Sequence, residues 1–346
     1  MGLSIPSTGR VMEQPSTVSS NSNTLYVGGS GEGNYTKIQD AIDNASDGDT
    51  VFVYDDSSPY YENLSINKSI DLIGEENYKP IIDGGGSWHV VDIYADNVTI
   101  NGFRIQSDEN HGIVLHSDYN CISNNIIKNH LCGIEGFDSS YNNISHNIIT
   151  GKYDGIDLSG SFNEIIGNTI ISHKDYDGTG IFLQATFYNR IERNVIKYCY
   201  FGITIFCSSH NIISQNIIQN NTALGIFLAI TSKTKIIENN FINNSINASF
   251  ARSFPMEILI KITGIRGIQT ELLKFKVLAT NTWDKNYWGR PYELPYLIHG
   301  FRGFLLIGYK GFIFSLLNFL EEPSSSIFNC VAIDWHPAKE PYDIEV

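Results

Sequence analysis

The stretch at residues 153–170, YDGIDLSGSFNEIIGNTI, contains the two units that decide the fold. The first is a Gly-Ile-x-apolar unit that begins at Gly155, and the second is an Asn-x-Ile-x-x-Asn unit that runs from Asn163 to Asn168. The glycine unit recurs at steps of 21, 22, 25, 22 and 23 residues, so the period is about 22. Its copies, of which the second is degenerate, begin at Gly112, Gly133, Gly155, Gly180, Gly202 and Gly225.

The asparagine unit follows each glycine unit, and its two asparagines stand five residues apart. We expect Lys235 with Asn240 to close the series. The asparagine pairs are Asn120 and Asn125, Asn142 and Asn147, Asn163 and Asn168, Asn189 and Asn194, and Asn211 and Asn216.

A period of this length fits one coil of a β-solenoid. At about 3.3 Å per residue, 22 residues trace roughly 70 Å, which is enough for three short strands and their turns. Inward Ile and Leu side chains then stack from coil to coil, and Asn amides bond the backbone and one another at the turns. We expect Gly to supply turn conformations that a Cβ would strain. The sequence therefore predicts an all-β, right-handed parallel β-helix.

Helical repeats of similar length are the competing fold, but Gly and Asn interrupt the segments every few residues, which excludes helix from Gly112 to Ile242. Upstream, the stretch YTKIQDAIDNA at 35–45 has a 3.6-residue stripe of Ile38, Ala41 and Ile42. It predicts one short helix before a first strand at 50–54. A solenoid end exposes open hydrogen bonds and apolar core, so we expect this helix to be the N-terminal cap.

Composition divides the chain into three parts. Residues 1–24 are rich in Ser, Thr, Pro and Asn and are predicted to be a disordered lead-in, followed by the β-helix with its cap at 25–250. Residues 251–346 lose the repeat and gain aromatic residues, which fits a C-terminal cap or, alternatively, a glycan-stacking surface.

The charge of the chain excludes some partners. With a formal net charge of −14, the protein would be repelled by nucleic acid and by an anionic membrane. The longest apolar run, residues 304–320, is shorter than the roughly 20 residues of a membrane span. Five cysteines, at neither CxxC spacing nor an even count, are expected to be small buried hydrophobes.

Nine N-x-[ST] sequons indicate an extracellular or cell-surface glycoprotein, and because residues 1–24 have no apolar leader segment, we expect that a leader peptide is missing from this chain. An Asn-rich repeat also generates sequons by chance. The sequon asparagines are Asn34, Asn44, Asn63, Asn67, Asn97, Asn143, Asn220, Asn243 and Asn247.

Several segments resemble the NosD-like β-helix family, which belongs to the pectin-lyase-like superfold and overlaps a carbohydrate-binding and sugar-hydrolysis domain class. They are YTKIQDAI at 35–42, DGDTVFV at 47–53, YEN at 61–63 and SIDLIG at 69–74, followed by the Gly-Ile coils. The tail NTWDKNYWG at 281–289, with DWHP at 334–337, looks like the end of archaeal surface proteins of this type. The copper label of NosD relatives implies clusters of His, Met or Cys, whereas this chain has three Met and nine scattered His.

Carboxylates concentrate between residues 135 and 177. In the outward slot of successive glycine units, Glu135 and Asp157 should lie one coil apart, about 5 Å, where they could divide acid and base roles or bind Ca²⁺. The DGIDL stretch at 154–158 is similar to one that carries a catalytic aspartate in polygalacturonases, which maps that role to Asp154. The preceding Lys-Tyr pair departs from that family's Asn-Thr, and its Gly-His-Gly and Arg-Ile-Lys motifs are missing. The candidate catalytic residues are Glu135, Lys152, Asp154, Asp157 and His173, with Tyr153, Asp175 and Asp177 as candidate carbohydrate-binding residues.

Two functions of different class follow. The first is a surface β-helix that binds polysaccharide or a surface glycan, or serves as a structural module. The second is a polysaccharide lyase, epimerase or glycoside hydrolase that uses the 135–177 patch. A solvated acidic face on an acidic protein would account for the same carboxylates.

Overall fold

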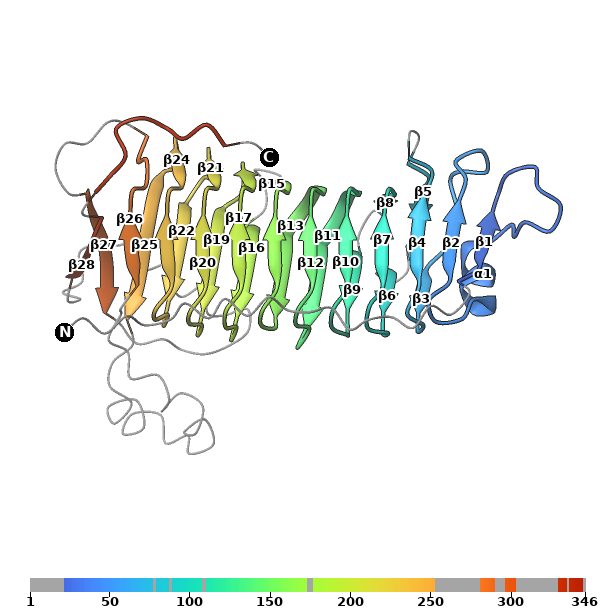
Figure 1. Cartoon of the computed structure of the whole chain (residues 1–346). Helices are drawn as coiled ribbons and strands as arrows, with labels where there is room; N and C mark the ends of the chain where they lie inside the picture. The colour runs from blue at the N-terminus through green and yellow to red at the C-terminus, as the bar shows by residue number, and fades with distance from the viewer. Residues whose placement is uncertain are drawn as a thin grey trace, which may run out of the picture.

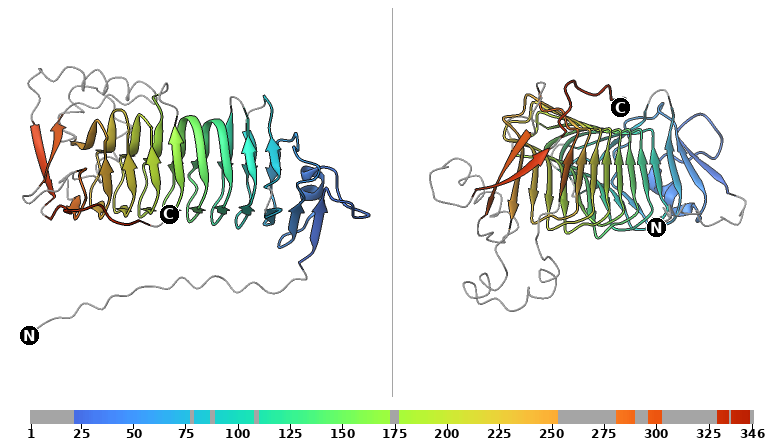
Figure 2. Two further views of the ribbon diagram at one scale, coloured as in Figure 1. Left: turned by 90° about the horizontal axis from the view of Figure 1, so that it is seen from above. Right: turned by 60° about the vertical axis from the view of Figure 1, so that its left-hand side comes forward.

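The computed structural model describes residues 22–76, 79–86, 89–107, 110–172, 177–252, 281–289, 296–302, 329–334 and 336–344. These residues form an elongated stack of coils, as Figures 1 and 2 show. Strands at the same position of adjacent coils pair in parallel. The predicted parallel β-helix is therefore confirmed.

Register divides the strands into three ladders. The first carries the glycine units and contains β3 (Leu64–Ile66), β6 (His89–Ile93), β9 (His111–Leu115), the second halves of β11 (Ile126–Phe137) and β13 (Ile148–Ser159), β16 (Thr179–Gln184), β19 (Phe201–Phe206), β22 (Leu224–Ala229), β25 (Ile246–Arg252) and β27 (Tyr296–Arg302). The second contains β1 (Thr24–Val27), β2 (Thr50–Val53), β4 (Asp71–Gly74), β7 (Thr99–Asn101), β10 (Cys121–Ser123), β12 (Asn143–Ser145), β14 (Glu164–Ile166), β17 (Arg190–Glu192), β20 (Ile212–Ser214), β23 (Lys235–Ile237), β26 (Thr282–Asp284) and β28 (Asn329–Asp334). The third contains β5 (Ile81–Asp83), β8 (Arg104–Gln106), the first halves of β11 and β13, β15 (Thr169–Ser172), β18 (Val195–Lys197), β21 (Ile217–Gln219) and β24 (Asn240–Ile242).

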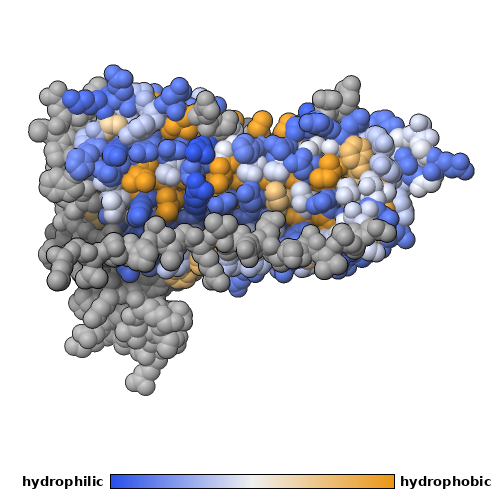
Figure 3. All heavy atoms as spheres, viewed as in Figure 1, coloured by the Kyte–Doolittle hydropathy of each residue, from blue (hydrophilic) through white to orange (hydrophobic). Residues whose placement is uncertain are grey.

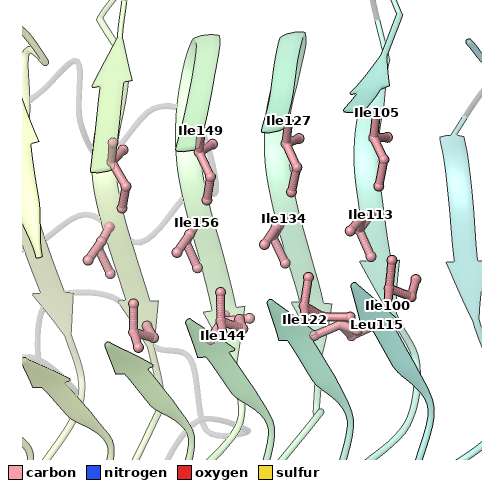
Figure 4. Close-up of a cluster of buried hydrophobic side chains, with 14 of the residues drawn as sticks. Ile100, Ile105, Ile113, Leu115, Ile122, Ile127, Ile134, Ile144, Ile149 and Ile156 are labelled. Carbon is pink, nitrogen blue, oxygen red and sulfur yellow. The ribbon is translucent and has the colours of Figure 1, made fainter. Parts of the chain in front are cut away.

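The core is a column of aliphatic side chains between these ladders. The isoleucine of each glycine unit pairs in register with that of the next coil, and Figure 4 shows three of them in line, at Ile113, Ile134 and Ile156. All three are fully buried. Outside, hydrophobic residues on the side seen in Figure 3 form separate patches among hydrophilic ones. Cys121, Cys132, Cys199 and Cys207 are free thiols, and Cys132 and Cys199 are buried.

The predicted asparagine ladder is present. The side-chain amide of Asn147, for example, donates to Oδ1 of Asn168 at 3.0 Å, and Asn168 donates in the same way to Asn194 at 3.0 Å. The expected end at Lys235 and Asn240 is wrong by one residue. The ladder passes from Asn216 to Asn239, whereas Asn240 pairs in register with Ile217 on β21. Strand register therefore places Asn239, and not the adjacent Asn240, in the ladder.

The repeat glycines have a different purpose from the one expected. None of the six has a positive φ, and each lies against a backbone carbonyl oxygen of the next coil. A Cβ on Gly155 would stand 2.4 Å from Cγ2 of Ile170 and 2.6 Å from the carbonyl oxygen of Gly180. The left-handed turn positions before the ladder asparagines are taken mostly by other residues, such as Tyr141 (φ 59°) and His146 (φ 56°).

The N-terminal end has the predicted helix, α1 (Ile38–Asn44), which buries Ile38, Ala41 and Ile42. It lies beside β1, β2 and β3 at this end of the stack (Figure 1), as a cap would. The helix does not precede the first strand, because β1 comes before it and pairs with β2 in parallel. The expected lead-in lies outside the described residues up to position 21.

The coil pattern also continues past residue 250. Asn281 and Asn286 form another asparagine unit, with Trp283 in the place of isoleucine and paired with Ile236. β27 and β28 then pair antiparallel at the C-terminal end (Figure 1). Trp335 and the whole apolar run at 304–320 lie outside the described residues. Among the helices that the structure does describe, none has the length and apolar character needed to cross a membrane.

Candidate functional site

Glu135 and Asp157 are neighbours on adjacent coils. They are register partners in the parallel pairing of β11 with β13, in the outward slot where the repeat places them. Glu135 is only 8% exposed, and Asp157 is half-buried. Two carboxyl groups that are shielded from water and one strand apart cannot both be ionised without cost.

Asp154 joins this pair from the same strand. Its carboxylate accepts a hydrogen bond from the backbone N–H of Thr179 at 2.7 Å, and its strand position pairs with Cys132. Burial raises the pKa of Asp154 above its usual value, and the charge of Glu135 adds to this shift. The structure therefore brings together the three acids that the sequence indicates: Glu135, Asp154 and Asp157.

Asp157 is the most perturbed of the three. Burial, followed by the charges of Asp154 and Glu135, raises its pKa to about 8. At neutral pH Asp157 is therefore mostly protonated and can donate a proton or a hydrogen bond.

A histidine, not predicted from the sequence, completes the site. Nδ1 of His111 on β9 contacts Oε2 of Glu135 on the next coil. His111 occupies the position that Cys132 and Asp154 occupy on the following coils, two residues before the core isoleucine. Aligning the coils of the sequence on their core isoleucines would have identified His111 as a candidate residue.

The cluster continues one coil further towards the N-terminus. Asp92 Oδ1 lies 2.8 Å from Nδ1 of His89 and 3.1 Å from Nε2 of His116, and the rings of His89 and His111 are 5.4 Å apart. Histidines on the coils of β6 and β9 and carboxylates on the coils of β6, β11 and β13 thus extend over four coils. We call this set the histidine–carboxylate cluster: His89, Asp92, His111, His116, Glu135, Asp154 and Asp157.

Exposed aromatic rings border the cluster. His116 stacks on Tyr94 at a centroid distance of 4.6 Å and lies 6.1 Å from Phe137. Tyr94 is 54% exposed and Phe137 is 47% exposed, so both rings remain available to a ligand. Apolar rings and buried polar groups together are typical of small-molecule and sugar sites.

The other predicted residues are less well placed. Lys152 is half-buried and Tyr153 is exposed on β13, directly before Asp154, while Asp177 is exposed. Both ends of the expected inserted loop lie against the carbonyl oxygen of Tyr153. This oxygen accepts a hydrogen bond from Ser172 Oγ at 3.2 Å, and a Cβ on Gly178 would stand 2.0 Å from it. His173 and Asp175, within this loop, lie outside the described residues.

The sequence model of the NosD family, described as periplasmic copper-binding protein (NosD), matches residues 42–292, which covers most of the described coils. The chain belongs to the NosD family. A cell surface glycoprotein of Methanothermus fervidus is 38% identical over 97 residues, which are 28% of this NosD-family chain and 16% of that protein. The chain thus matches about a sixth of its curated relative.

Solved structures share the fold at low identity. The Dettilon tailspike protein has a TM-score of 0.52 at 14% identity, over 73% of this NosD-family chain and 54% of the tailspike chain. Pectate lyase Pel9A also has a TM-score of 0.52 at 14% identity, over 67% and 75% of the two chains. Both likenesses concern the parallel β-helix itself.

The copper of the NosD description can be tested on the donor atoms. Copper prefers His, Cys and Met. The three methionines lie outside the described residues. Within the described ranges no three His, Cys, Asp or Glu side chains come together in a way that could hold a metal ion. Among the described residues, the donor side chains therefore do not fit the copper of that description.

Proposed function

We propose that this NosD-family chain is an extracellular or cell-surface β-helix protein that binds polysaccharide along the first ladder, at the histidine–carboxylate cluster. The observation that carries the proposal is the pair of exposed rings, Tyr94 and Phe137, on either side of His116. His116 in turn contacts Asp92 of the cluster.

The chemistry of this surface suits a sugar chain. Apolar ring surface packs against the C–H groups of sugars, and imidazole and carboxyl groups exchange hydrogen bonds with their hydroxyls. Because polar groups lie on four successive coils, the surface extends along the axis of the stack. A polymer with a repeating unit matches such a surface better than a single small molecule does.

The comparisons support the location and the ligand class. The segment shared with the cell surface glycoprotein favours a surface protein, and pectate lyase, whose name states a polysaccharide substrate, shares the fold. The density of sequons in the chain favours export as well.

Titration calorimetry tests the binding. We expect a panel of neutral and uronic-acid polymers to contain at least one ligand of the wild-type protein. Loss of either ring, in Tyr94→Ala or Phe137→Ala, should weaken that binding about fivefold, since a ring contact contributes about 1 kcal/mol. Tyr188→Ala is the matched control, because Tyr188 is 52% exposed on a distant coil. Equal affinity in all four proteins would refute the proposed surface.

The raised pKa of Asp157 supports a second candidate function, a polysaccharide-active enzyme. Asp157, whose raised pKa favours the protonated form, lies beside Glu135, and His111 contacts Glu135. Two neighbouring carboxyl groups of this kind could divide the acid and base roles. Strands about 4.8 Å apart place two carboxyls closer to the roughly 5–5.5 Å of retaining glycosidases than to the wider spacing of inverting ones. Asp154, Lys152, Tyr153 and His173 remain candidates for a lyase or epimerase.

Product analysis separates the two functions. The purified protein is incubated with the same polymers, and new reducing ends and unsaturated uronic products are followed. An enzyme should lose its product in Asp157→Asn and Glu135→Gln while sugar binding through Tyr94 persists. If the protein binds the polymers but forms no product, the enzyme function is refuted and only the binding function is retained.

A further inference from the structure

The nine sequon asparagines are distinct from the ladder asparagines. None of the nine is buried, whereas the ladder asparagines, such as Asn147 and Asn168, are buried with their side-chain amides hydrogen-bonded. Transfer of a glycan needs an accessible Nδ2 that is not already donating to the protein. The structure can therefore rank the nine sites.

Four sequon amides donate to a backbone carbonyl. Asn34 donates to Gly28 at 2.6 Å, and Asn44 donates to Asp40 at 2.7 Å. The other two, Asn63 and Asn247, donate to the carbonyls of His89 and Trp288. A glycan on any of these nitrogens would have to break or crowd a hydrogen bond of the fold.

Two more sites are half-buried. Asn143 lies within β12, where its Oδ1 atom is inaccessible, and Asn220 lies at the turn after β21. An oligosaccharide is bulky and needs open surface, so neither position suits it.

The remaining three sites are exposed: Asn67, Asn97 and Asn243. None of their side-chain amides donates to another residue within the described part of the chain. Asn97 (φ 58°) and Asn243 (φ 53°) also lie on left-handed turns that face the solvent. We infer that Asn67, Asn97 and Asn243 are the N-glycosylation sites of this protein.

The transfer is a simple substitution at the sugar. Nδ2 of the asparagine forms a bond to the anomeric carbon of a lipid-phosphate-linked oligosaccharide. The bond from that carbon to the phosphate oxygen breaks, the lipid phosphate keeps the electron pair, and the amide nitrogen loses one proton. The sequon hydroxyls are those of Ser69, Thr99 and Ser245.

Two of the sites share one corner of the stack. Ser69 Oγ donates to the carbonyl of Asp96 at 2.7 Å, which holds the turn of Asn67 against the turn of Asn97. The backbone N–H of Asn97 donates to Asp118, next to Tyr119, where the row of stacked rings Tyr119, Tyr141, Phe162 and Tyr188 begins. Glycans on Asn67 and Asn97 would cover the N-terminal part of this corner.

Glycopeptide mass spectrometry of the protein isolated from its own cells tests the inference. We expect oligosaccharide on the peptides that contain Asn67, Asn97 and Asn243, and bare peptides for Asn44 and Asn143. Asn44 is the sharper internal control, because it is exposed but its amide donates to Asp40. Glycan on Asn44 or Asn143 at equal occupancy, or no glycan on the three sites, would overturn the inference.

Variants that keep the asparagine separate modification from folding. Thr99→Val leaves the turn of Asn97 in place and removes only the sequon hydroxyl, whereas Ser69→Ala removes the sequon hydroxyl together with its hydrogen bond to Asp96. Each should abolish the glycan at its own site and leave the other two occupied, with the protein still folded by circular dichroism. An unchanged glycan at Asn97 in folded Thr99→Val would refute that site. The result does not depend on the proposed polysaccharide binding.

Discussion

The carboxylate of Asp334 accepts a hydrogen bond from the side-chain amide of Asn286 at 3.1 Å, although 48 residues separate them in the sequence. Asn286 is the last asparagine of the ladder that includes Asn147 and Asn239. The same oxygen, Oδ2, also accepts from the backbone N–H of Asn286 at 3.0 Å and from the indole N–H of Trp288 at 3.1 Å. A carboxylate accepts but cannot donate onward, so the fully buried Asp334 ends the ladder.

Asp334→Ala is expected to destabilise the C-terminal coils. It removes the acceptor of three N–H groups, namely the backbone N–H and the side-chain amide of Asn286 and the indole N–H of Trp288, at about 1–3 kcal/mol each. Because solenoid coils contact only their neighbours, hydrogen exchange should speed up most in β23 and β26 and little in β4 or β7. Asp284→Ala is the control, since its contact with the exposed His336 should contribute under about 1 kcal/mol. Similar exchange in both variants would contradict the assigned role of Asp334.

Gly155→Ala is expected to cost about 1–3 kcal/mol or more. The new methyl group would overlap Ile170 and the backbone of Gly180, and neighbouring coils cannot separate without losing strand pairing. Gly86→Ala is the matched control, because a Cβ there meets no atom within 4 Å, and it should change stability by less than about 0.5 kcal/mol. Urea denaturation of the two variants measures the difference. Equal stability would show that the coils are not in close contact at Gly155.

The contribution of Asp157 to the stability of the protein is expected to fall as pH rises from about 4 to 8. Asp157 has a pKa of about 8 in the folded protein and 3.8 as its ordinary value, so the folded state holds a proton that the unfolded state has released. The contribution of this one group is at most about 1.4 kcal/mol per pH unit. Asp157→Asn should flatten this dependence and raise stability at pH 8, as measured by urea midpoints at pH 5 and pH 8. An unchanged pH dependence would mean that Asp157 ionises normally.

The repeat could be predicted because it is local and periodic. The isoleucines and asparagines recur at nearly constant spacing, and stacking in register follows directly from that spacing. The shift at the adjacent pair Asn239 and Asn240 could not be resolved, since either asparagine fits the pattern and only strand register chooses between them. The unit at Asn281 was missed because Trp283 replaces isoleucine after a long interruption.

The reason for the repeat glycines was beyond the sequence. A glycine that makes room for a neighbouring coil looks the same in sequence as one that adopts a left-handed turn. Only the position of the Ile170 methyl group relative to Gly155 separates the two explanations.

The candidate site was half predictable. Glu135, Asp154 and Asp157 lie in or beside one repeat slot, so their proximity followed from the period. His111 and the contacts of Asp92 required positions to be compared across coils, outside the motif in which the acids were sought. The end of the ladder at Asp334 depends on a hydrogen bond between residues 48 positions apart, which no local pattern encodes.

The most direct test of the proposed function is a hydrogen–deuterium exchange footprint with a polysaccharide that binds the protein. We expect protection in the peptides that cover 89–94, 111–116 and 135–137, and unchanged exchange around Tyr188 and His210. Protection confined to the distant coils, or none at any polymer concentration that saturates binding, would contradict the placement of the binding surface at the histidine–carboxylate cluster.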